Sequence, residues 1–119
     1  MIVGVGTDIV ESARVAQACQ NPRFLSRCFT DAEQTYLQES GNYAGHFAAK
    51  EAVVKALGTG FSGFWPVAVE ITHDDKGRPV VRLHGKAADL AHAAAITRWD
   101  ISISHCQTHA VAMAIAQSV

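Results

Sequence analysis

The hydrophobic and polar positions of the chain change period several times, and each change predicts a new element. Stretches that alternate, or that are rich in β-branched residues, predict strands over residues 2–10, 67–73, 79–84, 101–105 and 109–116. A short polar turn joins the second strand to the third, and Gly77 supplies its positive φ. The last strand alternates large residues with alanine, so we expect a neighbour to pack closely on its alanine face.

Helical segments fill much of the sequence between these strands. They are predicted over 13–20, from Pro22 onward, from the capping box of Thr30 and Glu33 to about residue 39, over 43–57 and over 85–95. Ser12 is suited to cap the first of them, and Gly58 suits the left-handed stop of the fourth. Hairpins beside a separate block of helices predict an α+β fold, with a mainly antiparallel sheet packed by helices.

Size and charge narrow the classes of function. With 119 residues the chain has the length of a single domain, 1–119. Ten basic and eleven acidic residues give a net charge of −1, which argues against nucleic acid or an anionic membrane as partner. The sequence contains no apolar run of membrane-spanning length and no pattern of a secretory signal at its N-terminus. Three cysteines without CxxC spacing predict reduced thiols in a cytoplasmic protein.

The helix predicted over 43–57 carries an unusual set of charges. Lys50 and Glu51 fall within or beside its apolar stripe, Lys55 follows one turn after Glu51, and alanines cover most of the remaining surface. One interpretation is an exposed Glu51–Lys55 pair, which contributes about 0.3–0.5 kcal/mol. The other is a partly desolvated carboxylate, which needs stronger compensation, and a metal ion supplies it.

Asp8 is the second unusual carboxylate. It lies inside a predicted strand, where aspartate is depleted, and it shares a strand face with Gly4 and Gly6. Those glycines leave room for a ligand or another backbone. A plain aspartate at a strand end is the alternative. Two isolated acids suit magnesium, which takes one or two carboxylates together with substrate phosphates.

Three motifs then follow in order: GVGTDIVE at 4–11, FAAKEA at 47–52 with KALGTG at 55–60, and SISH at 102–105. Together they resemble the holo-acyl-carrier-protein synthases, the small bacterial 4′-phosphopantetheinyl transferases, over essentially the whole chain. The resemblance implies transfer of 4′-phosphopantetheine from coenzyme A to a serine of an acyl carrier protein, releasing 3′,5′-ADP, in support of fatty acid biosynthesis. It also implies a homotrimer with active sites at the subunit boundaries.

Site residues follow from the resemblance. Asp8 and Glu51 are expected to bind magnesium, and together with Lys55 they form the expected catalytic set. Either Glu51 or a metal-bound water is able to accept the serine proton. Contacts with coenzyme A are expected from Lys50, Lys55, Gly58, Thr59, Gly60, His46, Arg78, Pro79 and His105. Docking of an acidic carrier protein is expected at Arg14, Arg23 and Arg27.

Some positions depart from the family pattern. His46 stands where relatives commonly carry arginine, His109 stands where tyrosine is usual, and the segment 34–46 is short. These changes bear on coenzyme A affinity rather than on the chemistry.

Two other classes of function compete with catalysis: a non-catalytic binding module of the same fold, and a structural homo-oligomer. Asp8, Glu51 and Lys55 are all present, which favours the enzyme.

Overall fold

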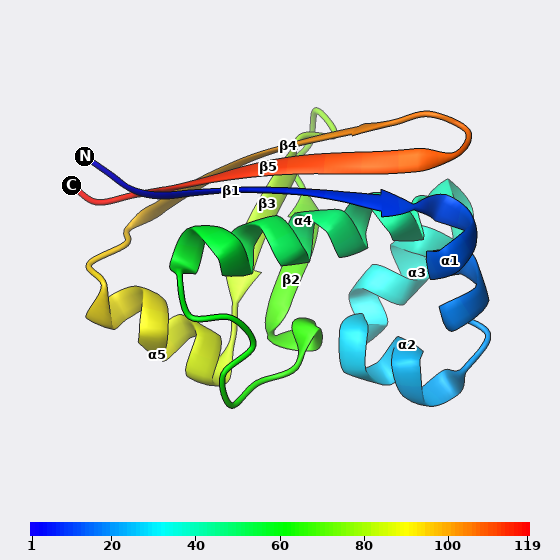
Figure 1. Cartoon of the computed structure of the whole chain (residues 1–119), viewed down its shortest axis with the longest axis horizontal. Coiled ribbons are helices and arrows are strands. Elements are labelled where there is room, and N and C mark those ends of the chain that lie inside the picture. Colours follow the sequence, from blue (N-terminus) through cyan, green and yellow to red (C-terminus); the bar gives the residue numbers. More distant parts are fainter.

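The computed structural model describes residues 1–119, and its elements form two antiparallel sheets and a set of helices around one long helix (Figure 1). The three-stranded sheet has the order β1-β5-β4, and the two-stranded sheet pairs β2 with β3. The strands are β1 Ile2–Glu11, β2 Val69–His73, β3 Pro79–Leu83, β4 Arg98–His105 and β5 His109–Gln117. The predicted α+β fold with antiparallel sheets is confirmed.

The helices are α1 Ser12–Ala18, α2 Pro22–Cys28, α3 Asp31–Ser40, α4 Tyr43–Leu57 and α5 Gly85–Ala93, with a 3₁₀ helix η1 at Pro66–Ala68. The predicted capping box is present: the Thr30 side chain accepts from the Glu33 backbone, and Glu33 accepts from Thr30. Gly58 ends α4 with φ 83°, as predicted. In Figure 1, α4 runs beneath the three-stranded sheet, α1 to α3 gather at one end, and α5 lies near the other.

Helix α4 lies unusually close to strands β1 and β5. The inward positions of β5 from Ala110 to Ala116 are alanines, and all of them are buried. On β1, a side chain at Gly4 or Gly6 would collide with the backbone carbonyls of Ala56 and Ala52. Small residues on both strands therefore allow the helix backbone to approach the sheet directly.

This packing identifies the neighbour predicted for the alanine face of β5. The neighbour on the alanine face of β5 is α4 of the same chain, and the near-complete burial of α4 is also achieved within one chain. Neither feature therefore requires a second subunit. Any case for an oligomer rests on the opposite face of the sheet.

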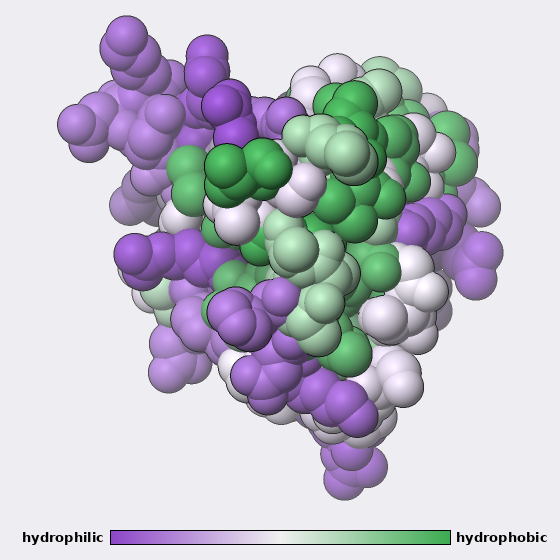
Figure 2. Space-filling view, turned by 90° about the vertical axis from the view of Figure 1, so that its left-hand side faces the viewer, coloured by the Kyte–Doolittle hydropathy of each residue, from purple (hydrophilic) through white to green (hydrophobic).

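That opposite face is exposed; it is mostly apolar on β1 and β5, whereas the exposed positions of β4 are polar. Its exposed large side chains include Val3, Val5, Ile9, Val111 and Met113. Figure 2 looks onto the end that carries the chain termini and shows that apolar surface gathers at this end too. Exposed apolar side chains gathered on one face are typical of a binding surface.

Three local predictions were wrong. Ser12 is the first residue of α1 and does not cap it, because the chain leaves β1 directly and Glu11 takes the cap position without a side-chain bond. Residues 67 and 68 belong to η1, which begins at Pro66, and not to β2. Strand β4 begins at Arg98, three residues before the predicted start, and Arg98, Trp99 and Asp100 continue the alternation of the strand. The structure contains no helix long and apolar enough to cross a membrane.

Candidate active site

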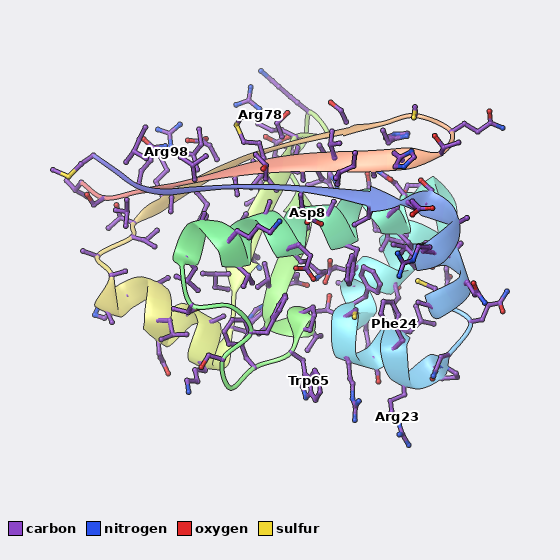
Figure 3. All side chains as sticks on the ribbon, in the orientation of Figure 1. Asp8, Arg23, Phe24, Trp65, Arg78 and Arg98 are labelled. Atoms are coloured by element: carbon purple, nitrogen blue, oxygen red, sulfur yellow. The ribbon has the colours of Figure 1, made fainter.

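Asp8, Glu51 and Lys55 meet where β1 crosses α4. Asp8 faces the helix from the strand, and the Lys55 ammonium group donates to its carboxylate at 3.1 Å and to the Thr7 carbonyl at 3.0 Å. Lys55 therefore pairs with Asp8 and not with Glu51, so the simple pair within the helix is not formed. Figure 3 shows Asp8 on the side of the sheet that faces α4.

Glu51 is the less compensated of the two carboxylates. It is half-buried, and no hydrogen bond or ion pair within the chain holds it. Burial raises the pKa of Glu51, the Asp8 carboxylate raises it further, and Lys55 opposes the shift. Two close carboxylates that share one ammonium group leave an excess of negative charge.

The donor set fits magnesium. The chain forms no cluster of three or more His, Cys, Asp or Glu side chains able to hold a metal ion. Two carboxylates without further protein ligands match magnesium completed by substrate oxygens and water, and they do not match a closed zinc or calcium site. The repulsion between Asp8 and Glu51 is the feature that a cation would relieve.

Lys50 is a correction to the predicted coenzyme A contacts. Its side chain is fully buried, and its ammonium group donates to Glu33 at 2.7 Å and to the Val69 carbonyl at 2.5 Å, with Pro66 further away at 3.5 Å. Burial lowers the pKa of Lys50, and the Glu33 carboxylate opposes that shift. With its hydrogens already bonded inside the chain, Lys50 has none to offer a phosphate, and it ties α4 to α3, η1 and β2 instead.

A cavity of about 530 Å³ on another part of the surface is lined by His46, Arg78, Pro79 and His105. His46 is buried; its Nδ1 lies 3.1 Å from Glu33, while its Nε2 has no partner. Its ring stacks on Tyr36 and His73, which sequence reasoning missed. Burial, and next the nearby His46, lower the pKa of His73. The Nε2 atom is itself buried and has no hydrogen-bond partner within the chain.

The two groups of predicted residues are not brought together in one chain. Asp8 and Lys55 line one cavity, while His46, Arg78 and His105 line another. Asp8 lies on β1 and His105 on β4, at opposite edges of the three-stranded sheet with β5 between them. In Figure 3, Arg78 lies at the far side of the sheet from Asp8.

The remaining predicted residues lie on the surface. Gly58 and Gly60 both have positive φ and frame the exposed Thr59 directly after α4, close in sequence to Lys55. The three arginines predicted to dock a carrier surround the contact between Phe24 and Phe47, whose ring centroids are 5.9 Å apart. Arg14 borders the cavity on one side of this contact, and Arg23 and Arg27 border the cavity on the other.

Sequence reasoning also missed an aromatic wall. Phe61, Phe64 and Trp65 follow the glycine loop and line the same cavity as Glu51. Arg27 lies over the Trp65 ring, 4.4 Å from its centroid. The signal was present in the sequence, because FSGFWP places three aromatic residues in six positions outside any predicted element.

Comparison with known proteins identifies the family. The 4′-phosphopantetheinyl transferase superfamily matches residues 4–114. A protein of Alkaliphilus metalliredigens (strain QYMF) named holo-[acyl-carrier-protein] synthase is 47% identical over 121 aligned positions, covering 98% of this chain and 99% of the relative.

Solved structures agree. The holo-[acyl-carrier-protein] synthase of Neisseria meningitidis superposes with a TM-score of 0.88 at 31% identity, covering 99% of this chain and 100% of that one. The enzyme of Helicobacter pylori in complex with coenzyme A gives a TM-score of 0.83 at 29% identity, covering 95% and 99%. The family predicted from the motifs is therefore confirmed, and this chain belongs to the 4′-phosphopantetheinyl transferase superfamily, among the relatives named holo-[acyl-carrier-protein] synthase.

Proposed function

We propose that this chain transfers 4′-phosphopantetheine from coenzyme A to a serine of an apo acyl carrier protein, giving the holo carrier and 3′,5′-ADP. Residues 1–119 form the transferase domain in this proposal. The observation that carries it is the pair of carboxylates, Asp8 and Glu51, which repel each other and share only Lys55. The relative crystallised with coenzyme A supports the choice of donor.

Asp8 and Glu51 would hold the magnesium ion. When bound, the ion supplies positive charge that neutralises the pyrophosphate and the charge developing on the transferred phosphoryl group. Lys55 is exposed and lies one turn beyond Glu51, so its ammonium group is able to meet the charge that develops on the departing 3′,5′-ADP.

The proposed transfer forms one bond to phosphorus and breaks another. The serine oxygen forms a bond to the phosphorus that carries pantetheine, and the bond from that phosphorus to 3′,5′-ADP breaks. The serine loses its proton, and either the Glu51 carboxylate or a water molecule would accept it. The negative charge leaves with 3′,5′-ADP.

Intact mass spectrometry tests this function. A candidate apo carrier is incubated with the protein, coenzyme A and magnesium, and we expect its mass to rise by one phosphopantetheine group. Omission of magnesium should abolish the increase. If apo carriers remain unmodified while the protein still binds coenzyme A, the chain is a binding module and the proposal fails.

We further propose that the physiological carrier serves fatty acid biosynthesis in the cytoplasm.

We also propose that the protein is a homotrimer with active sites shared between chains. Asp8 and His105 lie at opposite edges of the sheet, so one coenzyme A molecule would contact both groups most readily across a subunit boundary. The exposed apolar face of the sheet, with Val5, Ile9 and Met113, offers the surface for that boundary.

Complementation tests the shared site. Asp8→Ala and His105→Ala proteins are mixed under conditions that exchange subunits, and hybrids should recover activity that neither parent has. Light scattering measures the oligomeric state alongside. A monomer with full specific activity at micromolar concentration would contradict the shared site. Absence of rescue in a confirmed trimer would mean that both residues serve the same site from one chain.

A further inference from the structure

Arg27 differs from the other two arginines predicted to dock a carrier, because an aromatic ring holds its guanidinium group. The guanidinium carbon lies over the Trp65 ring, 4.4 Å from its centroid, which is within the range of a cation–π contact. Arg14 and Arg23 are also exposed, but neither makes an ion pair or a cation–π contact within the chain. One arginine of the three is therefore restrained, and two are free.

The backbone around Trp65 gives the ring a fixed base. Pro66 follows it and favours an extended conformation, and Trp65 has φ −96° and ψ 162°. The Trp65 carbonyl accepts from the Ala68 backbone at 3.0 Å, and the Lys50 ammonium group lies 3.5 Å from the Pro66 carbonyl. The ring itself is exposed, and Figure 3 shows that Trp65 and Arg23 project from the same side of the molecule, away from the sheet.

We propose that Trp65 is a positioning residue, whose ring holds the Arg27 guanidinium group ready to bind a carboxylate of an acidic carrier protein; this inference rests on the proposed function. The ring takes up one side of the guanidinium group and leaves the N–H groups turned away from it free to donate. No carboxylate of the chain pairs with them. A guanidinium group is able to donate two parallel hydrogen bonds to one carboxylate, provided that it is correctly oriented.

Restraint of Arg27 before binding raises the affinity for the carrier. A free arginine loses rotamer freedom when it docks, and that loss weakens binding by up to about tenfold. Arg27 has given up part of this freedom already, because it lies on the Trp65 ring. Arg27 and Trp65 also line the same cavity as Glu51, whereas Arg14 borders a different one. A carboxylate bound by Arg27 would therefore help to place the carrier serine near Glu51.

Trp65 is better suited to this role than to a role in the fold. Its ring is 57% exposed, so its removal uncovers little of the interior. The neighbouring aromatic residues, Phe61 and Phe64, pack against the core and against each other, with ring centroids 5.6 Å apart. The fold of this segment therefore rests on the two phenylalanines, and Trp65 is left for a function at the surface.

Steady-state kinetics provide the test, with an apo acyl carrier protein that the wild-type protein modifies as the probe. Trp65→Ala should raise the KM for the carrier about three- to tenfold, because Arg27 must then be ordered during docking. The values of kcat and of the KM for coenzyme A should change less than about twofold. Trp65→Phe, whose ring also attracts a cation, should recover most of the loss.

A double-mutant cycle separates positioning from a direct contact between the ring and the carrier. Arg27→Ala should raise the KM for the carrier more than Trp65→Ala does, and in the Arg27→Ala background Trp65→Ala should add little. Arg27→Lys should cost more than Arg23→Lys, because only Arg27 has an oriented guanidinium group to lose. Lys86→Ala, which removes a cation that lies against Gly63 of the same segment, is the control for net charge and should be silent.

Four results would overturn the assignment. An unchanged KM for the carrier in Trp65→Ala would show that the ring plays no part in docking, and multiplicative effects in the cycle would show that it acts without Arg27. Equal losses for Arg27→Lys and Arg23→Lys would remove the distinction between the two arginines. Equal rises in the KM for the carrier and for coenzyme A, with a lower melting temperature, would assign Trp65 to the fold. Failure of the wild-type protein to modify any apo carrier would instead contradict the proposed function, so the two failures are distinguishable.

Discussion

Lys50 and Lys55 lie five residues apart on one helix, and each is paired with a carboxylate from another element. Lys50 is fully buried, and Glu33 and two backbone carbonyls surround its ammonium group. The Lys55 side chain is 55% exposed and bonds to Asp8 at the rim of a cavity. Beside it, Glu51 has no partner within the chain.

The two clusters differ in how completely their charged groups are paired within the chain. Around Lys50, donors and acceptors match, so the group has nothing left to bind and serves the fold. Around Lys55, two carboxylates share one cation, and the deficit of positive charge leaves a place for a ligand. Both clusters pair a lysine of α4 with a carboxylate from another element, so the completeness of that pairing is the feature that separates a structural charge from a functional one.

Lys50→Met should give the largest effect on stability. It leaves the Glu33 carboxylate buried beside His46 without its ammonium partner, so the free energy of unfolding should fall by about 3–5 kcal/mol in urea denaturation. Lys55→Met is the matched control and should cost at most about 1 kcal/mol, because that pair is exposed. Equal losses in the free energy of unfolding would contradict the distinction between a structural Lys50 and a functional Lys55. Glu33→Leu added to Lys50→Met should recover part of the loss.

Glu51→Ala and Asp8→Ala should give the largest effect on catalysis. Each removes a proposed metal ligand, so turnover measured as holo carrier by mass should fall at least about 100-fold. Thermal stability should hold or rise, because each change relieves repulsion between carboxylates. Glu39→Ala, an exposed acid on α3, is the control and should be silent. Near-normal turnover of both variants at saturating magnesium would contradict the metal assignment.

Lys55→Ala should have an intermediate effect. The charge that Lys55 meets on the leaving 3′,5′-ADP exists mainly in the transition state, so kcat should fall about tenfold with little change in the KM for coenzyme A. Steady-state kinetics with both substrates varied gives the two constants. The opposite pattern, a constant kcat with a much higher KM, would reassign Lys55 to ground-state binding.

Glu70 provides a third, smaller cluster that sharpens the comparison. Burial raises the pKa of Glu70, but hydrogen bonds from His84 and Thr30 outweigh it and hold the pKa below its ordinary value. A carboxyl with a depressed pKa contributes stability above its unfolded pKa and loses it as the pH falls through the folded one.

Thr30→Val removes both the N-cap of α3 and the hydrogen bond to Glu70, so it should cost about 1–3 kcal/mol at neutral pH and less in acid, where only the loss of the cap remains. Denaturation with urea at pH 7 and at pH 3 measures the two values. A loss that is the same at both would show that the hydrogen bond to Glu70 does not depend on its charge.

The elements that the sequence predicted well are those with local signals. The capping box of α3, the glycine stop of α4 and the alternation of β5 each need only neighbouring residues, and each is present. The neighbour of the β5 alanines is α4, which is distant in sequence, so the alternation predicted a close neighbour but could not identify it.

Some residues of the candidate site could likewise be predicted from the sequence, and others could not. Asp8 and Glu51 are conspicuous in the sequence because each interrupts an apolar pattern, and the structure brings them together. Lys50 interrupts the pattern just as strongly, but its partner Glu33 lies 17 residues away, and no periodicity reveals that contact. Tyr36 and His73, which stack with His46, come from separate elements and could not be placed without the fold.

The absence of side chains at Gly4 and Gly6 sets limits on which mutations this chain can accept. At either position even one added methyl group would push β1 away from α4 and draw Asp8 away from Glu51. Such a variant would be inactive although the altered residue touches neither substrate nor metal, and no change of rotamer would relieve it, because the obstacle is backbone. The tolerance of the site to mutation is therefore narrowest at two positions that have no chemistry of their own.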